Sequence, residues 1–207
     1  LDSEVNKKVE ESIIKLKELG HKVEYVSFPY LDFLVPTYYV LTTAEASSNL
    51  ARFDGVHYGF RSEKTENLEQ TYINSRTEGF GEEVKRRIML GTFVLSAGYH
   101  DAYYKKAQQV RRLVQNKTNE ILEKYDFILS PTTPHTAFDL GKKQTDPTVM
   151  YLEDIFTVQA NITGHPSISL PLYKHSRGMP FGLQILSQKF TEKELLSFSE
   201  EIMKNLL

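Results

Sequence analysis

The sequence contains no cysteine and no tryptophan, and its charges nearly cancel. Without cysteine, disulfides, thiolate metal sites and a cysteine nucleophile are all excluded. The 25 Lys and Arg residues against 27 Asp and Glu residues leave a net charge of −2. That balance excludes the broad basic field that nonspecific nucleic-acid binding requires, so any contact with RNA would be local or would belong to a partner.

Long apolar runs are also missing. No segment approaches the ~20 apolar residues that span a bilayer, and the charged beginning of the chain does not resemble a signal peptide. We therefore expect a cytoplasmic protein. A chain of 207 residues can bury a sizeable hydrophobic core without stabilisation by disulfide bonds. Because the first residue is Leu rather than Met, we expect the chain to have been cut from a longer one.

Motifs for metals and nucleotides are absent as well. The six histidines never come closer than ten residues, so the close histidine pairs of helical zinc motifs do not occur. A metal site assembled from distant segments remains open. The G-x-S-x-G elbow, the phosphate loop and the G-x-G-x-x-G fingerprint are missing, since Gly79-Phe80-Gly81 lacks a third glycine and follows no strand. We expect no metal and no cofactor in this chain.

What is present is the alternation of helices and strands that is typical of an α/β protein. A helix capped by Asp2 or Ser3 is predicted to run to Gly20, and residues 21–27 alternate like a strand. Further strands are predicted at 126–130, 168–172 and 181–187. Further helices are predicted at 37–52, 150–162 and 192–206, and through most of 67–125 with breaks at 79–81, 91 and 98. The clearest long helix is 101–125, whose basic residues we expect to face solvent rather than RNA. Residues 141–147 are predicted to form an exposed loop.

Three segments have unusual chemistry. Residues 38–55 combine small residues with Tyr, Glu, Ser and Asn, a pattern that suits either a tightly packed helix or a ligand site. In residues 78–91, two glutamates precede Lys85, Arg86 and Arg87, which suits the helix dipole. Alternatively, one arginine holds a carboxylate with its planar guanidinium group. In residues 150–171, Asp154 either favours a helix dipole or accepts hydrogen bonds from a ligand ammonium group.

These segments carry a resemblance to a known family. Residues 44–55, 78–91 and 99–107 resemble the A subunits of glutamyl-tRNA(Gln) amidotransferases, which are members of the amidase signature family. Residues 130–132 and 180–184 are shared more widely among amidases. The resemblance covers essentially the whole chain. It implies one amidase-type domain over residues 1–207, an α/β fold of the α/β/α kind with a mixed sheet covered by helices.

The resemblance also shows what the chain lacks. Enzymes of the amidase signature family use a Ser nucleophile, a second Ser and a Lys within a Gly- and Ser-rich signature in their N-terminal half. Here no two glycines are adjacent, and the one Ser-Ser pair, Ser47-Ser48, lies in a different motif. No catalytic residue is therefore assigned in this chain. It resembles the C-terminal portion of the family's amidotransferase members, and we expect it to be inactive by itself.

Substrate recognition is what the resemblance does imply. In the family a Tyr, an Arg and an Asp hold glutamine, and Tyr38, Arg87 and Asp154 occupy the matching motif positions. Arg87 would bind the α-carboxylate, Asp154 the α-ammonium group, and the phenol of Tyr38 would close the pocket. Arg86 is the competing candidate for the carboxylate.

The resemblance further implies partners. The complete protein hydrolyses glutamine, and the ammonia passes to a B subunit that uses ATP and Mg²⁺ to convert Glu-tRNA(Gln) to Gln-tRNA(Gln). The B and C subunits are thus the expected partners, and tRNA is expected to bind through the B subunit. Two alternatives remain open: a scaffold module that mainly forms subunit interfaces, and a fragment of another amidase. We also expect the strands near Phe127, Ile168 and Leu183 to meet in one sheet whose bare edge or face promotes self-association.

Overall fold

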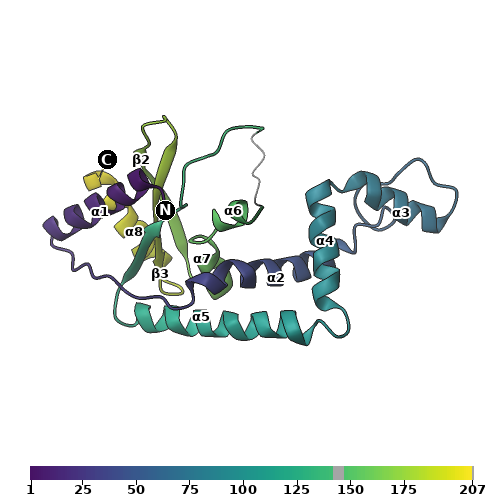
Figure 1. Ribbon diagram of the computed structural model, residues 1–207, viewed down its shortest axis with the longest axis horizontal. Helices are drawn as coiled ribbons and strands as arrows, with labels where there is room; N and C mark the ends of the chain where they lie inside the picture. The colour runs from purple at the N-terminus through teal and green to yellow at the C-terminus, as the bar shows by residue number, and fades with distance from the viewer. Residues whose placement is uncertain (142–146, 207) are drawn as a thin grey trace. The chain divides into compact units, whose positions relative to one another are not determined.

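The computed structural model describes residues 1–141 and 147–206, and Figure 1 shows its elements. The predicted loop at 141–147 lies almost entirely outside the described residues. The helices are α1 (Ser3–Glu18), α2 (Leu31–Leu50), α3 (Leu68–Gly79), α4 (Glu82–Leu95), α5 (Lys106–Leu122), α6 (Pro147–Leu152), α7 (Val158–Thr163) and α8 (Glu192–Leu206), with a π-helical turn η1 (Asp101–Lys105). The strands are β1 (Phe127–Pro131), β2 (Ser167–Lys174) and β3 (Pro180–Ser187).

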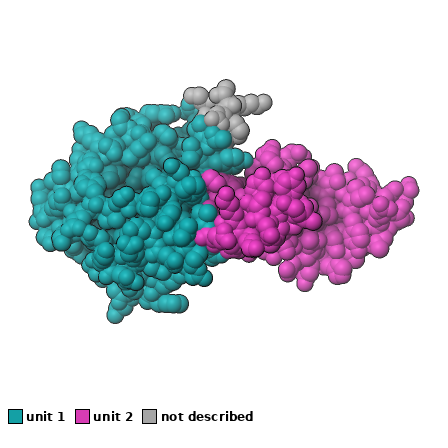
Figure 2. Space-filling view, turned by 60° about the horizontal axis from the view of Figure 1, so that its bottom comes forward, with its two compact units in different colours: residues 1–35, 110–207 teal, residues 36–109 magenta. Residues whose placement is uncertain are grey.

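The described residues group into two compact units (Figure 2). Unit 1 comprises residues 1–35 and 110–207, and unit 2 comprises residues 36–109. The sheet lies in unit 1, whereas unit 2 is helical. The expectation of one amidase-type domain over residues 1–207 stays a prediction.

The sheet of unit 1 has the order β1-β3-β2, and both pairings are antiparallel. Leu129 pairs with Ile185 across one ladder, and Leu170 pairs with Leu183 across the other. The three predicted strands therefore do meet in one sheet, and the α/β class is confirmed. Because successive side chains of a strand point to opposite faces of the sheet, the side chains of β3 are divided between these two faces.

One face of the sheet carries the main hydrophobic core. Leu183 and Ile185 of β3 pack there with Leu16 of α1 and with Leu195 and Ile202 of α8. All five side chains are at most 3% exposed. Helices α1 and α8 accordingly lie against the sheet (Figure 1). The opposite face of β3, which bears Gln184, is turned toward the segment before α7.

Helix α1 has the ends that its sequence predicts. The carboxylate of Asp2 accepts hydrogen bonds from the backbone N–H groups of Glu4 and Val5, at 2.8 and 3.2 Å, and so caps the helix. Gly20 follows the last turn with a φ of +94°, a left-handed conformation that glycine adopts without strain.

Residues 21–27 do not form the predicted strand. The alternation of polar and apolar residues is real, and Val23 packs against the core of unit 1. A strand also needs a neighbouring backbone to complete its hydrogen-bond ladder, and none of the described strands pairs with this segment. The prediction of a strand at 21–27 was therefore wrong for this chain.

Unit 2 corrects two further predictions. Helix α2 begins at Leu31, six residues before the predicted start, and so includes Pro36. Gly91 does not break a helix but lies inside α4. A Cβ atom at Gly91 would be 2.0 Å from the carbonyl oxygen of Thr43 in α2, so this glycine permits close packing of the two helices. Ser47 of segment 38–55 also lies at this contact, because its Cβ would be 2.6 Å from the same added atom.

The predicted helix 101–125 is interrupted at its start. The N–H of Lys105 donates to the carbonyl of His100, five residues earlier, which produces the π-helical turn η1 before α5 begins. The basic residues Lys106, Arg111 and Arg112 of α5 are exposed, as expected. Arg111 Nε also donates to the carbonyl oxygen of Ile162 at 2.7 Å. Within the described ranges, no helix combines the length and apolar content needed to cross a membrane.

Candidate functional site

Arg87 lies on α4 where that helix packs against α2. Its Nε is 2.9 Å from Oε1 of Glu83, and its guanidinium carbon is 5.7 Å from the ring centroid of Tyr39. The hydrogen bond to Glu83 raises the pKa of Arg87 above its ordinary value. The guanidinium is therefore held between a carboxylate and an aromatic ring, in an orientation that suits the recognition of a second carboxylate.

Tyr38 is the neighbour of that aromatic ring. The rings of Tyr38 and Tyr39 meet edge to face, with centroids 5.3 Å apart. Both side chains are half-buried, as is Arg87. Tyr38 and Arg87 thus belong to one aromatic and cationic surface of unit 2, whose third member is Tyr39.

Arg86, the competing candidate, also pairs with Glu83. Its side chain is 66% exposed, compared with 42% for Arg87. A guanidinium that is more shielded from solvent binds a carboxylate more strongly, because competing hydration is reduced. The geometry favours Arg87, and the choice between the two arginines remains a prediction.

Asp154 lies in unit 1, and its position corrects the predicted helix at 150–162. The chain there forms two short helices, α6 and α7, with a turn at residues 153–157 that carries Asp154. The hydroxyl of Thr157 donates to the carbonyl oxygen of Asp154 at 3.1 Å, and the N–H of Val158 donates to the same oxygen at 3.0 Å. The β-branched residues of this turn also disfavour a continuous helix.

The turn that carries Asp154 is tied to neighbouring segments by two contacts. Gln184, in the central strand β3, donates from Nε2 to the carbonyl oxygen of Phe156 at 3.0 Å. His135 Nδ1 lies 2.8 Å from Oε1 of Glu153. Gln184 is only 6% exposed, and sequence reasoning gave it no role. The signal available was a polar residue within the apolar run Phe-Gly-Leu-Gln-Ile-Leu, because a buried amide must find a partner.

A shallow hollow of about 320 Å³ opens between α7 and the sheet. Its polar lining includes Thr157, Asn161, Ser169 and Gln184, and His165 closes one side. Hydroxyl and amide groups dominate this lining, which makes the hollow suitable for a neutral hydrogen-bonding ligand.

His165 is a buried histidine that sequence reasoning also left without a role. Its Nδ1 is 2.9 Å from the hydroxyl of Thr163, and its Nε2 is 3.0 Å from Oδ1 of Asn119. Burial, with a smaller effect from Lys189, lowers the pKa of His165 to about 4. The imidazole is therefore neutral at physiological pH and links α5 to the segment between α7 and β2.

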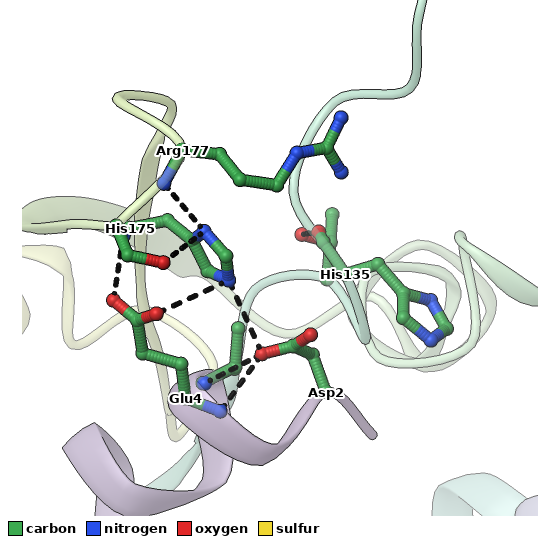
Figure 3. A network of polar contacts seen from close by, with 8 residues as sticks. Asp2, Glu4, His135, His175 and Arg177 are labelled. Carbon is green, nitrogen blue, oxygen red and sulfur yellow. Dashed lines mark hydrogen bonds and ion pairs between the residues drawn. The ribbon is translucent and has the colours of Figure 1, made fainter.

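A second polar cluster joins α1 to the β2–β3 hairpin (Figure 3). Glu4 accepts a hydrogen bond from the N–H of Ser176 at 2.8 Å and lies 3.3 Å from Nε2 of His175, while Asp2 lies 3.6 Å from the same nitrogen. The N–H of Arg177 donates to Nδ1 of His175 at 3.1 Å. These contacts fasten the hairpin to the start of α1. Over residues 1–141 and 147–206, no group of three or more His, Asp or Glu residues is arranged to hold a metal ion.

Comparison with known proteins gives the family. The model of the amidase family matches residues 1–196. The chain is 52% identical over 202 residues to the A subunit of glutamyl-tRNA(Gln) amidotransferase from Prosthecochloris aestuarii, a match that covers 98% of this chain and 42% of the relative. It is 48% identical over 208 residues to the corresponding protein of Staphylococcus epidermidis, with 100% and 43% covered.

Solved structures agree with this result. The crystal structure of the A subunit of glutamyl-tRNA(Gln) amidotransferase from Thermotoga maritima matches with a TM-score of 0.67 and 42% identity, over 93% of this chain and 36% of that one. A second crystal structure, of an amidase, matches with a TM-score of 0.77 at 22% identity, over 100% of this chain and 43% of that one, and so shows the fold alone.

The expected resemblance to amidotransferase A subunits is thereby confirmed. The chain spans less than half of the length of the relatives that it matches. Helices α1 and α8 pack against its sheet, and Gln184 of β3 contacts the turn before α7. The chain belongs to the amidase family.

Proposed function

We propose that this chain is the glutamine-recognition portion of a glutaminase subunit that supplies ammonia for the conversion of Glu-tRNA(Gln) to Gln-tRNA(Gln). The observation that carries the proposal is the 52% identity, over 98% of the chain, to the A subunit of a glutamyl-tRNA(Gln) amidotransferase. The 202 aligned residues cover 98% of this chain, and so they include the segments that hold the candidate recognition residues.

Within this proposal three residues contact glutamine. Arg87 binds the α-carboxylate, for which its fixed guanidinium beside Tyr39 is suited. Asp154 accepts hydrogen bonds from the α-ammonium group, and Tyr38 closes the pocket over the aliphatic part of glutamine. Each assignment rests on the motif position of the residue and on its surroundings within its own unit.

The proposed partners follow from the same relationship. The B and C subunits complete the amidotransferase, and the B subunit binds Glu-tRNA(Gln), ATP and Mg²⁺. The net charge of −2 is compatible with a protein that handles glutamine while a partner handles tRNA. A cytoplasmic location is part of the same proposal.

The chain by itself is proposed to be inactive, because no Ser-Ser-Lys catalytic set is recognised in it. The test joins this chain to the part of the Prosthecochloris relative that it does not match, and measures glutamate released from glutamine in the presence of the B and C subunits. We expect activity in the joined protein and none in the 207-residue chain. Asp154→Ala in the joined protein is the matched negative control.

Two other outcomes would each contradict the proposal. A folded joined protein that binds the B and C subunits but releases no glutamate would indicate a scaffold module. Hydrolysis of a different amide in preference to glutamine would indicate another amidase.

A further inference from the structure

The first part of the turn at residues 153–157 is weakly fixed by its own backbone. Its first three N–H groups, those of Glu153, Asp154 and Ile155, donate to carbonyl oxygens three residues earlier at 3.4, 3.3 and 3.2 Å. Such distances lie at or beyond the long end of the range for good N–H···O bonds, so these contacts are weak. The stronger local hydrogen bonds, from the Val158 N–H at 3.0 Å and the Thr157 hydroxyl at 3.1 Å, are made to the backbone carbonyl of Asp154. Contacts from outside the turn therefore contribute to the position of the Asp154 carboxylate.

Gln184 supplies such a contact from the central strand of the sheet in unit 1. Its backbone lies in the central strand, opposite Ser130 of β1 on one side and Ser169 of β2 on the other. Only 6% of the residue is exposed, and its Nε2 donates to the carbonyl oxygen of Phe156 at 3.0 Å. A partly buried hydrogen bond from a strand that is paired on both sides restrains the turn more than a fully exposed contact does.

We propose that Gln184 is a positioning residue for the Asp154 carboxylate in glutamine recognition. It acts through Phe156, and it is not placed in contact with the substrate itself. The inference rests on the proposed function, because it takes Asp154 to be a glutamine ligand.

The chemistry of the contact explains why glutamine suits this position. The carbonyl of Phe156 needs a donor, and an amide N–H₂ supplies one without bringing a charge into a buried site. Methionine has a similar length and volume but donates no hydrogen bond, which would leave the carbonyl unsatisfied. A glutamate carboxylate would repel the carbonyl when ionised, and would donate to it only when protonated.

The first test uses the 207-residue chain and hydrogen exchange. In Gln184→Met, the amides of residues 155–158 are expected to exchange faster, while the amides of α8 keep their protection. Gln115→Met is the matched control, because Gln115 Nε2 donates to the carbonyl of Thr163 at 2.9 Å, at the far end of α7. That variant should leave the exchange of 155–158 unchanged. Unchanged exchange in Gln184→Met would overturn the proposal.

The second test uses the complete amidotransferase, in which this chain is joined to its missing part and to its partners. Gln184→Met is expected to raise the KM for glutamine roughly tenfold while kcat stays nearly constant, because the Asp154 carboxylate is then less well placed to bind the α-ammonium group. If Gln184→Met does not fold, Gln184→Glu replaces it. The KM of that variant should fall toward the wild-type value as the pH is lowered and its carboxyl group gains a proton.

The outcomes separate this inference from the proposed function. Wild-type protein without glutaminase activity would overturn the proposed function and, with it, the role given to Asp154. Wild-type activity accompanied by an unchanged KM in Gln184→Met, or by a fall in kcat alone, would overturn only the positioning role. A KM for Gln184→Glu that does not respond to pH would contradict the donor role of Gln184.

Discussion

Thr43 and Gly91 meet at a backbone contact that leaves no room for a side chain. A Cβ atom on Gly91 would lie 2.0 Å from the carbonyl oxygen of Thr43 and 2.6 Å from Cβ of Ser47. One turn earlier on each helix, the guanidinium carbon of Arg87 lies 5.7 Å from the ring centroid of Tyr39. The close approach of α2 and α4 therefore determines where the candidate carboxylate ligand lies relative to its aromatic neighbour.

The first prediction concerns this contact. Gly91→Ala is expected to lower the free energy of unfolding by about 1–3 kcal/mol, because the added methyl group forces the two helices apart. Helix propensity acts in the opposite direction, since Ala is favoured over Gly by about 1 kcal/mol. Urea unfolding followed by circular dichroism measures the difference.

Gly81→Ala is the control for Gly91→Ala. Gly81 precedes α4, and a Cβ atom there would meet nothing within 4 Å. Its effect should stay below about 1 kcal/mol, the range of N-cap substitutions. A Gly91→Ala variant that is as stable as the wild-type protein would show that α2 and α4 do not pack as closely as described.

The second prediction concerns the link between α1 and the β2–β3 hairpin. Glu4 accepts the N–H of Ser176 at 2.8 Å and lies 3.3 Å from Nε2 of His175 (Figure 3). Glu4→Ala is expected to lower the free energy of unfolding by about 1 kcal/mol, through the loss of this hydrogen bond. In Glu4→Ala the backbone N–H of Ser176 should also exchange its hydrogen with solvent faster. Glu18→Ala, at the exposed end of α1, should change neither quantity.

The sequence predicts elements well where burial alone determines them. Helix α8 follows its predicted bounds, 192–206, and the three strands of the sheet were placed within one or two residues. Residues 21–27 and Gly91 were misjudged for a different reason, because both depend on what lies opposite in space. A strand needs a partner, and a glycine inside a helix is explained only when Thr43 is seen against it.

The candidate site shows the same division. Tyr38, Arg87 and Asp154 were assigned through the resemblance to a family, since their local patterns also fit ordinary helix surfaces. The sequence can mark Gln184 as a polar residue within an apolar run, but it cannot identify the partner, which is a backbone carbonyl 28 residues earlier. Every residue has a backbone carbonyl, so the amino-acid sequence does not show which carbonyl accepts a hydrogen bond. Only the structure shows this contact.

The third prediction concerns acid stability. The pKa of His165 is lowered by burial to about 4, below its ordinary value of about 6.5. In that interval the unfolded chain takes up a proton that the folded protein does not, so stability falls as the pH is lowered. One such group changes the free energy of unfolding by roughly 1 kcal/mol per pH unit between about pH 6.5 and 4.

His165→Gln separates this effect from the titration of other groups. Glutamine has no titratable group, so the variant should be less sensitive to pH over the same interval. Urea unfolding at several pH values measures the slope for both proteins. Equal slopes would mean that His165 is not the buried neutral group described here.

The final prediction rests on the proposed function and distinguishes Arg87 from Arg86 as the carboxylate ligand in the joined protein with its proposed B and C subunits. A hydrogen bond to a charged group contributes about 1.5–3 kcal/mol, so Arg87→Ala is expected to raise the KM for glutamine roughly 10- to 100-fold. Arg86→Ala should change it less than about fivefold, since exposed ion pairs contribute less than about 1 kcal/mol. The reverse pattern would move the assignment by one residue.

An analogue of glutamine that lacks the α-carboxylate makes this test specific. The wild-type enzyme should hydrolyse it poorly, because Arg87 then has no carboxylate to bind. In Arg87→Ala the analogue and glutamine should have similar values of kcat/KM, because neither substrate can then form the interaction between an α-carboxylate and the guanidinium of Arg87. In Arg86→Ala the wild-type preference for glutamine should persist. If Arg87→Ala keeps that preference, then Arg87 acts by stabilising α4 and its contact with Tyr39, and the carboxylate ligand lies elsewhere.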